Sequence, residues 1–153
     1  MKPRGGNMRH ALGLFALGLL TLAASAEWVP ADPAIPAFHN APPGKAAPHL
    51  LPESEWRGPY FSHGYQTTAY RMAGAVSDVL YQQPCFCWCS KAMGHKSLHS
   101  CFEGSHGAVC ATCMKEAAYT YRQTRLGRTP AEIRAGIVKG EWNDVDLTAI
   151  HTD

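Results

Sequence analysis

The sequence predicts a small, mostly helical domain with a cysteine-rich loop, preceded by a signal peptide and a proline-rich arm. A length of 153 residues suits one domain. Three stretches carry apolar residues at helical spacing, and no stretch shows the alternation typical of a strand. All six cysteines lie within the 29 residues from Cys85 to Cys113. At 46% hydrophobic and 17% charged residues, the chain is too apolar to be disordered throughout.

The first 26 residues have the pattern of a secretory signal peptide. Three basic residues precede an apolar run of 14 residues at 11–24, and Ala24 and Ala26 supply the small side chains that signal peptidase requires. The run is shorter than the ~20 residues of a membrane-spanning helix, which disfavours an uncleaved anchor. We therefore expect cleavage after Ala26 and export to the periplasm or the cell exterior.

Cleavage changes the charge of the chain. The full sequence has 14 Lys and Arg against 12 Asp and Glu, a net charge of +2. Residues 1–26 contain three of the basic residues and none of the acidic ones, so the mature chain carries 11 against 12, a net charge of −1. This balance argues against a nucleic-acid partner. No second apolar run follows, so we expect no membrane span in the mature protein.

The segment 27–55 is predicted to be a tether or loosely packed arm. Eight prolines lie between residues 27 and 59, and proline is incompatible with a continuous helix. We expect the folded domain to begin near Trp56 and to extend to residue 153. Its last stretch, 143–153, is expected to be a solvated tail.

Two predicted helices flank the cysteine-rich loop. The first covers about 66–82 and ends before Pro84. Its apolar face comprises Tyr70, Ala73, Val76 and Leu80. The second covers about 107–126 and ends at Gly127. Its apolar face comprises Val109, Cys110, Cys113, Met114, Ala117 and Tyr121.

A third helix has the clearest start signal. Thr129 is a capping residue, Pro130 occupies the first helical position, and Glu132 completes a capping box. Ile133 and Ile137 lie one turn apart and are expected to be buried. Gly140 is the expected end of this helix.

The cysteines have the spacing C-x-C-x-C-x11-C-x8-C-x2-C. Side chains two apart in an extended backbone point the same way, so Cys85, Cys87 and Cys89 are expected to present their sulfurs on one side. Phe86 and Trp88 would then pack on the other side. The pair of the C-x-x-C motif, Cys110 and Cys113, shares a face near a helix start, where the helix dipole favours thiolate. We expect the two groups to face one another.

The leading interpretation is a site for a soft metal ion, copper or zinc, because thiolate and imidazole ligands select these metals. The candidate ligands are Cys85, Cys87, Cys89, His95, Cys101, Cys110 and Cys113. Met93 and Met114 lie nearby as thioether donors. One zinc ion takes four ligands, so either some donors are structural or more than one ion binds. His106 is a weaker candidate, and His99 is expected to be exposed. A c-type haem is excluded because Met114, not His, follows the C-x-x-C motif.

Two alternatives use the same cysteines. One is a thiol–disulfide oxidoreductase whose reactive residues come from Cys87, Cys89, Cys110 and Cys113, although the βαβ context of a thioredoxin-type motif is missing. The other is a binding module stapled by three disulfides, which suits a small exported domain. Three cysteines within five residues make a poor set of staples, because their crosslinks constrain the same short loop.

Several ordered motifs resemble one family. They are Pro84–Cys89 (PCFCWC), Gly94–Leu98 (GHKSL), Cys101-Phe102, His106-Gly107 and Cys110–Cys113 (CATC). Together they resemble the exported bacterial proteins named for a PCYCGC or CYCXC motif, and the likeness extends to the preceding helix and to 129–137. Some members of that family replace a motif cysteine with selenocysteine, which implies a reactive or metal-binding thiol. This chain has Phe86 in place of Tyr and Trp88 in place of Gly; if that Gly serves a positive φ, Trp88 strains the turn.

Overall fold

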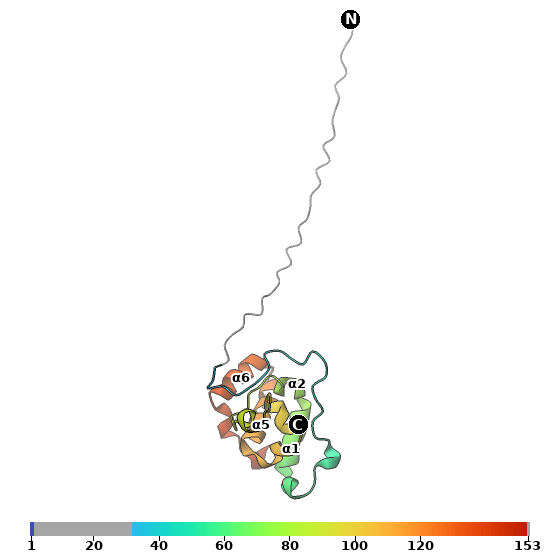
Figure 1. The fold of residues 1–153 in the computed structure, drawn as a ribbon, viewed down its shortest axis with the longest axis vertical. Coiled ribbons are helices and arrows are strands. Elements are labelled where there is room, and N and C mark those ends of the chain that lie inside the picture. Colours follow the sequence, from blue (N-terminus) through green and yellow to red (C-terminus); the bar gives the residue numbers. More distant parts are fainter. Residues whose placement is uncertain (2–31, 153) are drawn as a thin grey trace. The chain divides into compact units, whose positions relative to one another are not determined.

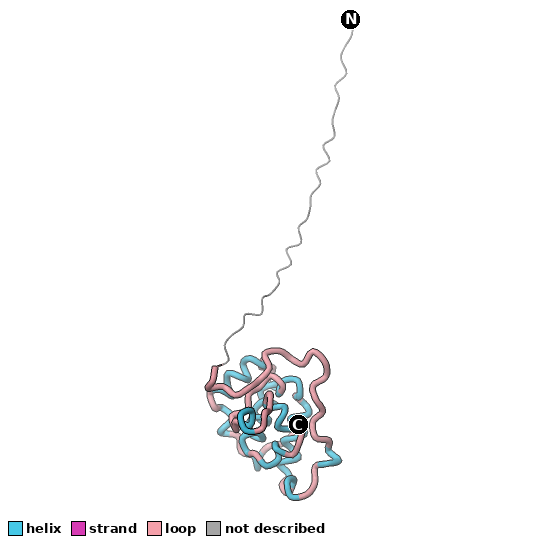
Figure 2. Tube along the Cα trace, in the orientation of Figure 1, coloured by secondary structure: helices cyan, strands magenta, loops and turns pink. Residues whose placement is uncertain are grey.

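The computed structural model describes Met1 and residues 32–152 and confirms a mostly helical domain. Within these residues the chain forms helices joined by loops, without a strand (Figure 2). The three longest helices are α1 (Gly64–Ala75), α5 (Ala111–Arg125) and α6 (Pro130–Val138). The short ones are α2 (Ser77–Leu80), α3 (Cys89–Ala92) and α4 (His106–Val109). Five 3-10 helices complete the fold: η1 (Glu53–Glu55), η2 (Pro59–Phe61), η3 (Leu98–Phe102), η4 (Glu141–Asp144) and η5 (Leu147–Ala149). The predicted signal peptide and its cleavage site lie outside the described residues.

The helix predicted at 66–82 is divided in two. Val76 has φ −131° and ψ 30°, which ends α1 at Ala75 before α2 begins at Ser77. The predicted apolar face survives the break, because the α1 and α2 residues assigned to it are all buried. These are Tyr70, Ala73, Val76 and Leu80.

The helix predicted at 107–126 is also interrupted, at Cys110. This residue has an extended backbone, φ −116° and ψ 106°, and separates α4 from α5. The prediction that Val109 is buried is wrong: its side chain is 59% exposed, because the extended residue breaks the helical register that would have aligned it with the face of α5. Gly127, with φ 77°, follows α5 as predicted.

The third helix follows its sequence signals. The backbone N–H of Thr129 donates to Glu132 Oε2 at 2.8 Å, and the N–H of Glu132 donates back to Thr129 Oγ1 at 3.3 Å. Ile133 and Ile137 are buried, and Gly140, with φ 79°, ends the helix. The capping box and the apolar pair therefore fix α6 as predicted.

Helix α5 occupies the centre of the domain. It packs most extensively against α1, and it also contacts α6 and η4 (Figure 1). Its residues from Cys113 to Tyr121 are almost all buried, which makes it the scaffold for the rest of the core. The cysteine-rich loop leaves α2 and returns to α5 through η3 and α4. Both ends of that loop are thus held on packed helices.

The described part of the proline-rich arm lies on the domain. The ring of His39 stacks on Tyr81 with centroids 3.8 Å apart, and the guanidinium of Arg134 lies 4.4 Å from the ring centroid of Phe38. The N–H of Leu51 donates to the carbonyl of Phe102 at 2.8 Å. These contacts connect residues 38–51 to α2, α6 and η3.

The C-terminal stretch packs on the domain too. The expectation of a solvated tail is wrong at Val145 and Ile150, which are buried members of the apolar core. A branched apolar side chain gains free energy by leaving water, and both find room against the packed helices. The end of the chain therefore contributes to the fold.

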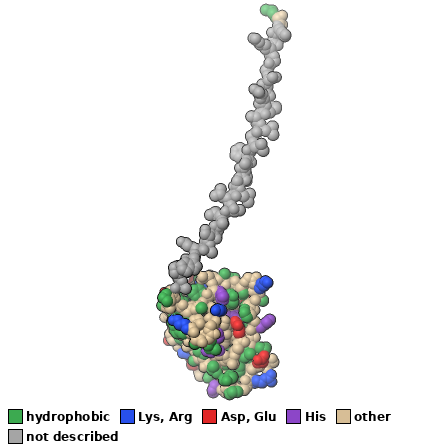
Figure 3. Space-filling model, viewed as in Figure 1, with side chains coloured by type: hydrophobic (Ala, Val, Ile, Leu, Met, Phe, Trp, Pro, Cys, Tyr) green, Lys and Arg blue, Asp and Glu red, His purple; other side chains and the backbone are tan. Residues whose placement is uncertain are grey.

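The described surface carries mixed charges. On the face drawn in Figure 3, Lys and Arg side chains are interspersed with Asp and Glu. Among the described residues, no helix is both long enough and apolar enough to cross a membrane.

Candidate metal centre

The first cysteine segment forms a turn. The N–H of Trp88 donates to the carbonyl of Cys85 at 3.2 Å, which closes a turn over Phe86 and Cys87 before α3 begins at Cys89. The prediction of an extended C-x-C-x-C segment is wrong, since this hydrogen bond folds the chain back on itself. Trp88 has φ 61°, the only positive φ of a non-glycine residue in the described chain. The condition raised for the family's glycine at this position is therefore met, and Trp88 adopts the positive φ itself.

Three sulfurs form a compact triangle. The Sγ of Cys85 lies 3.3 Å from that of Cys87 and 3.5 Å from that of Cys113, and Cys87 and Cys113 are 3.6 Å apart. The sulfurs of a regular tetrahedral zinc site with Zn–S of about 2.3 Å are about 3.8 Å apart. The triangle is therefore close to the spacing at which one ion binds several thiolates. The two cysteine groups face one another here, as expected.

A second group of donors adjoins the triangle. The Sγ of Cys89, at the start of α3, lies 3.4 Å from the Sγ of Cys101 on η3. His95 Nδ1 lies 3.5 Å from Cys101. The predicted ligand His95 thus contacts the cysteine cluster from the loop between the first two groups of cysteines.

His106 and Cys110 complete the centre. His106, on α4, places Nε2 at 3.7 Å from the Sγ of Cys87, and Cys110 is the residue before α5. Three sets of four donor atoms have all members within 4.8 Å of one another. They are Cys85, Cys87, Cys101 and Cys113; Cys87, Cys89, Cys101 and His106; and Cys87, His106, Cys110 and Cys113. The Cys and His groups are therefore close enough to hold a metal ion.

Most of the sulfur is removed from water. Cys85, Cys89, Cys101 and Cys113 are at most 3% exposed, and no disulfide joins any two of the six cysteines in this structure. Hydrogen bonds from surrounding thiols, first from Cys101, lower the pKa of Cys87. Hydrogen bonding to Cys101 raises the pKa of Cys113. Of these two cysteines, Cys87 is therefore the one whose surroundings favour the thiolate.

The imidazole of His95 is half-buried beside the ring of His106. Its burial, and then the nearby His106, lower its pKa, which favours the neutral ring. The two rings meet edge to face with centroids 5.2 Å apart. A neutral imidazole offers a lone pair to a metal ion, whereas the protonated ring offers none.

A buried carboxyl group supports the loop. Glu116, on α5, is fully buried and accepts a 2.8 Å hydrogen bond from the N–H of Phe86. Burial raises the pKa of Glu116 to about 8. Its second oxygen, Oε2, has no protein hydrogen-bond partner. Glu116 is not among the residues predicted from the sequence, because a lone Glu in a helix is ordinarily exposed.

The histidines differ from their expected roles. His106 was predicted to be a weaker candidate than His95, yet His106 belongs to two of the three donor sets and His95 to none. The prediction that His99 is exposed is wrong. Its ring is fully buried, with Nε2 at 3.0 Å from Ser77 Oγ and Nδ1 at 2.9 Å from Glu103. These two hydrogen bonds offset the cost of burial.

The two thioether candidates differ in exposure. Met93 is 56% exposed, whereas Met114 is buried in the apolar core.

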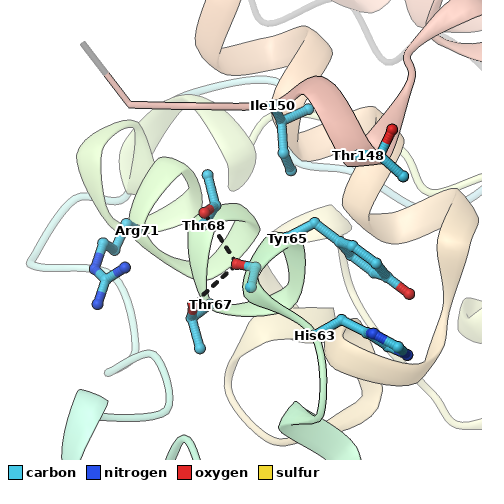
Figure 4. Close-up of a pocket in the computed structure, with 8 residues that line it drawn as sticks. His63, Tyr65, Thr67, Thr68, Arg71, Thr148 and Ile150 are labelled. Atoms are coloured by element: carbon cyan, nitrogen blue, oxygen red, sulfur yellow. Dashed lines mark hydrogen bonds between the residues drawn. The ribbon is translucent and has the colours of Figure 1, made fainter.

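A hollow of about 620 Å³ lies apart from the cysteines. It is lined by residues at the start of α1 and by Thr148 and Ile150 near the C-terminus (Figure 4). The hydroxyls of Thr67 and Thr68 point back to the carbonyl of Gly64, and Arg71 pairs with Glu53. Its polar groups are therefore largely engaged within the protein.

Comparison with known proteins places the chain in one family. No curated protein and no solved structure matches it. The family model described as "Protein of unknown function with PCYCGC motif" matches residues 59–144, which include α1 to α6 and every donor named above. The match covers more than half of the chain, and the chain belongs to the PCYCGC family.

Proposed function

We propose that this chain is an exported soft-metal-binding protein that holds copper or zinc through thiolates. The proposed ligands are Cys85, Cys87, Cys89, Cys101, Cys110 and Cys113, with His95 and His106 as imidazole donors. The observation that carries the proposal is the triangle of Cys85, Cys87 and Cys113, whose three sulfurs are 3.3–3.6 Å apart.

The triangle favours a metal site over disulfide staples. In a stapled framework the sulfurs lie in separate pairs, each bridge joining two residues. Here the sulfurs of Cys85, Cys87 and Cys113 are all in mutual contact, so a bridge between any two of them leaves the third against the bridge instead of in a separate pair. A metal ion engages all three at once.

Burial adds a second argument. An ionised thiolate in an apolar interior loses its hydration, and a bound cation restores the lost stabilisation. Cys101 and Cys113 are fully buried, so a thiolate there requires such a cation. Soft sulfur donors select Cu(I) or Zn²⁺ over hard ions such as Mg²⁺ or Ca²⁺.

Metal content and thiol count on one sample test this proposal. The protein is purified without reducing agent or chelator from the compartment to which it is exported. We expect at least one equivalent of copper or zinc, with the cysteines unreactive toward alkylating reagent until the metal is removed. Oxidation of all six thiols with substoichiometric metal would overturn the proposal. The N-terminus is measured on the same sample, and a chain that retains residues 1–26 would contradict export by a cleaved signal peptide.

A thiol–disulfide redox function is the second candidate. It is favoured by the lowered pKa of Cys87 and by the 3.6 Å contact between Cys87 and Cys113. In that reaction two thiols lose two electrons and two protons to a disulfide of a partner protein, which is reduced to two thiols. This candidate predicts rapid alkylation of Cys87 in the metal-free protein and a reversible two-electron couple. Uniformly slow alkylation of all six cysteines would count against it.

A further inference from the structure

We propose that the centre holds a cluster of at least two metal ions that share the sulfur of Cys87. This inference rests on the proposed metal-binding function and concerns the number of ions and the residue that joins them. It follows from how the three donor sets overlap.

Cys87 is the one donor common to all three sets. Each set also has one cysteine that no other set contains: Cys85 in the first, Cys89 in the second and Cys110 in the third. The remaining donors, Cys101, Cys113 and His106, each belong to two sets. The sets are therefore overlapping groups of four donors that all include the sulfur of Cys87.

Sulfur and nitrogen differ in their ability to bridge. A thiolate sulfur has three lone pairs and can bind two ions at once, whereas the Nε2 of a neutral imidazole has one lone pair and binds one. His106 therefore serves only one of its two sets. The first set combines with the second through Cys87 and Cys101, and neither shared donor is a histidine. Two ions are accommodated without conflict.

A single ion leaves part of the centre unexplained. An ion bound by the first set leaves Cys89 only 3% exposed and 3.4 Å from the coordinated sulfur of Cys101. The sulfur of Cys89 is then in contact with neither water nor a metal ion. A second ion bound by Cys87, Cys89, Cys101 and His106 engages it.

The contacts of Cys87 agree with a bridging role. Its sulfur lies 3.3 Å from that of Cys85, which belongs only to the first set, and 3.7 Å from His106 Nε2, which belongs to the second set and not to the first. Donors of both ion sites are therefore in contact with this one sulfur.

The number of metal ions bound per chain, measured in the wild type and in two Cys→Ala variants, tests the cluster. The mature chain is titrated anaerobically with Cu(I) and examined by native mass spectrometry, with the Cys110→Ala and Cys87→Ala variants alongside. We expect at least two Cu(I) per chain in the wild type and in Cys110→Ala, because the first two sets lack Cys110. We expect Cys87→Ala to retain at most one. Equal metal content in the two variants would overturn the inference.

A spectroscopic measurement on the wild-type chain tests the cluster without relying on the folding of a variant. The wild-type chain is loaded with an NMR-active cadmium isotope, which binds thiolates as zinc does. We expect at least two resonances with mutual scalar coupling, since the bonds through a shared sulfur transmit it. One bound ion, or two uncoupled ions, would overturn the cluster and leave the proposed function standing. A wild-type chain that binds neither Cu(I) nor cadmium would overturn the proposed function itself.

Discussion

The carboxyl group of Glu116 accepts a 2.8 Å hydrogen bond from the backbone N–H of Phe86, thirty residues earlier in the chain. The contact holds the turn between Cys85 and Cys87 against α5, the helix that carries Cys113. The geometry of the sulfur triangle thus depends on a residue that is not among the proposed ligands. Such supporting hydrogen bonds orient the ligands of metal centres.

Replacing Glu116 tests the importance of its hydrogen bond to the Phe86 N–H. Glu116→Ala leaves the N–H of Phe86 buried without an acceptor, which costs about 1–3 kcal/mol of unfolding free energy. Glu116→Gln keeps an acceptor oxygen and is expected to lose less stability and less metal affinity. Denaturant unfolding and competitive metal titration measure both effects, with exposed Glu55→Gln as the control. Equal behaviour of the Ala and Gln variants would contradict a positioning role for this hydrogen bond.

The positive φ of Trp88 predicts a difference between two small replacements. Trp88→Ala and Trp88→Gly both lose the edge-to-face contact with Phe86, but only Gly adopts φ 61° without steric cost. We expect the Gly variant to be more stable than the Ala variant by about 1 kcal/mol. Gly94→Ala gives the reference cost of placing Ala at a positive φ, because Gly94 has φ 74° and its Cβ position is in open space. Denaturant unfolding measures all three. An Ala variant as stable as the Gly variant would contradict the left-handed turn.

Two histidines are expected to respond in opposite ways. His99→Ala removes a buried ring bonded to Ser77 and Glu103 and should cost about 1–3 kcal/mol of stability. His106→Ala removes a half-buried donor and should leave stability nearly unchanged. Its loss of metal affinity should at least match the roughly 10- to 100-fold effect of removing an outer-shell partner. Thermal unfolding of the metal-free protein and metal titration distinguish the two, with exposed His49→Ala as the control. A larger affinity loss for His99→Ala, in a folded protein, would reverse the assignment.

Two helical glycines form a matched pair. A Cβ at Gly136 on α6 would lie 2.0 Å from Tyr119 Oη and 2.8 Å from Glu141 Oε2. Gly136→Ala must therefore displace a buried ring and is expected to lower the unfolding free energy by about 1–3 kcal/mol. Gly74→Ala on α1 meets nothing within 4 Å and should be neutral or stabilising by up to about 1 kcal/mol. Denaturant midpoints compare them. Equal effects at the two positions would contradict the close packing of α6 on α5.

Tyr119 gives a pH-dependent prediction. Burial, and then the hydrogen bond that its hydroxyl donates to Glu141, raise the pKa of Tyr119 to about 12. The unfolded value is about 10, so the folded chain retains this proton where the unfolded chain loses it. The contribution of Tyr119 to stability is thus fully present below about pH 10 and lost as the pH rises to about 12.

The measurement is the difference in unfolding free energy between wild type and Tyr119→Phe across that pH range. The difference should shrink as the pH rises, while exposed Tyr60→Phe should show no such trend. A difference that stays constant from about pH 10 to about pH 12 would contradict the raised pKa.

Several features could be predicted from the sequence because they depend on interactions between residues close together in the chain. The capping box of Thr129 and Glu132 fixed the start of α6, since its hydrogen bonds involve residues three apart. The apolar face from Tyr70 to Leu80 was also predicted, because burial follows the spacing of the side chains. The location of the thiols in one cluster followed from their density between Cys85 and Cys113.

The helix breaks at Val76 and Cys110 could not be predicted from a local sequence pattern. Neither Val nor Cys is a strong helix breaker, so neither break shows in the residue types around it. The same applies to the turn at Trp88, where the family resemblance, not the residue type, pointed to a positive φ.

The sequence by itself thus determined that this chain is mostly helical and places six cysteines in one segment. Only the tertiary structure decided which donors meet: Cys113 with Cys85 and Cys87, His106 with Cys87, and Glu116 beneath the loop. The physical reason is the range of the interactions. Caps and helical faces depend on neighbours within a few residues, whereas the centre depends on how α4 and the loop pack on α5, and that packing is fixed by the whole core.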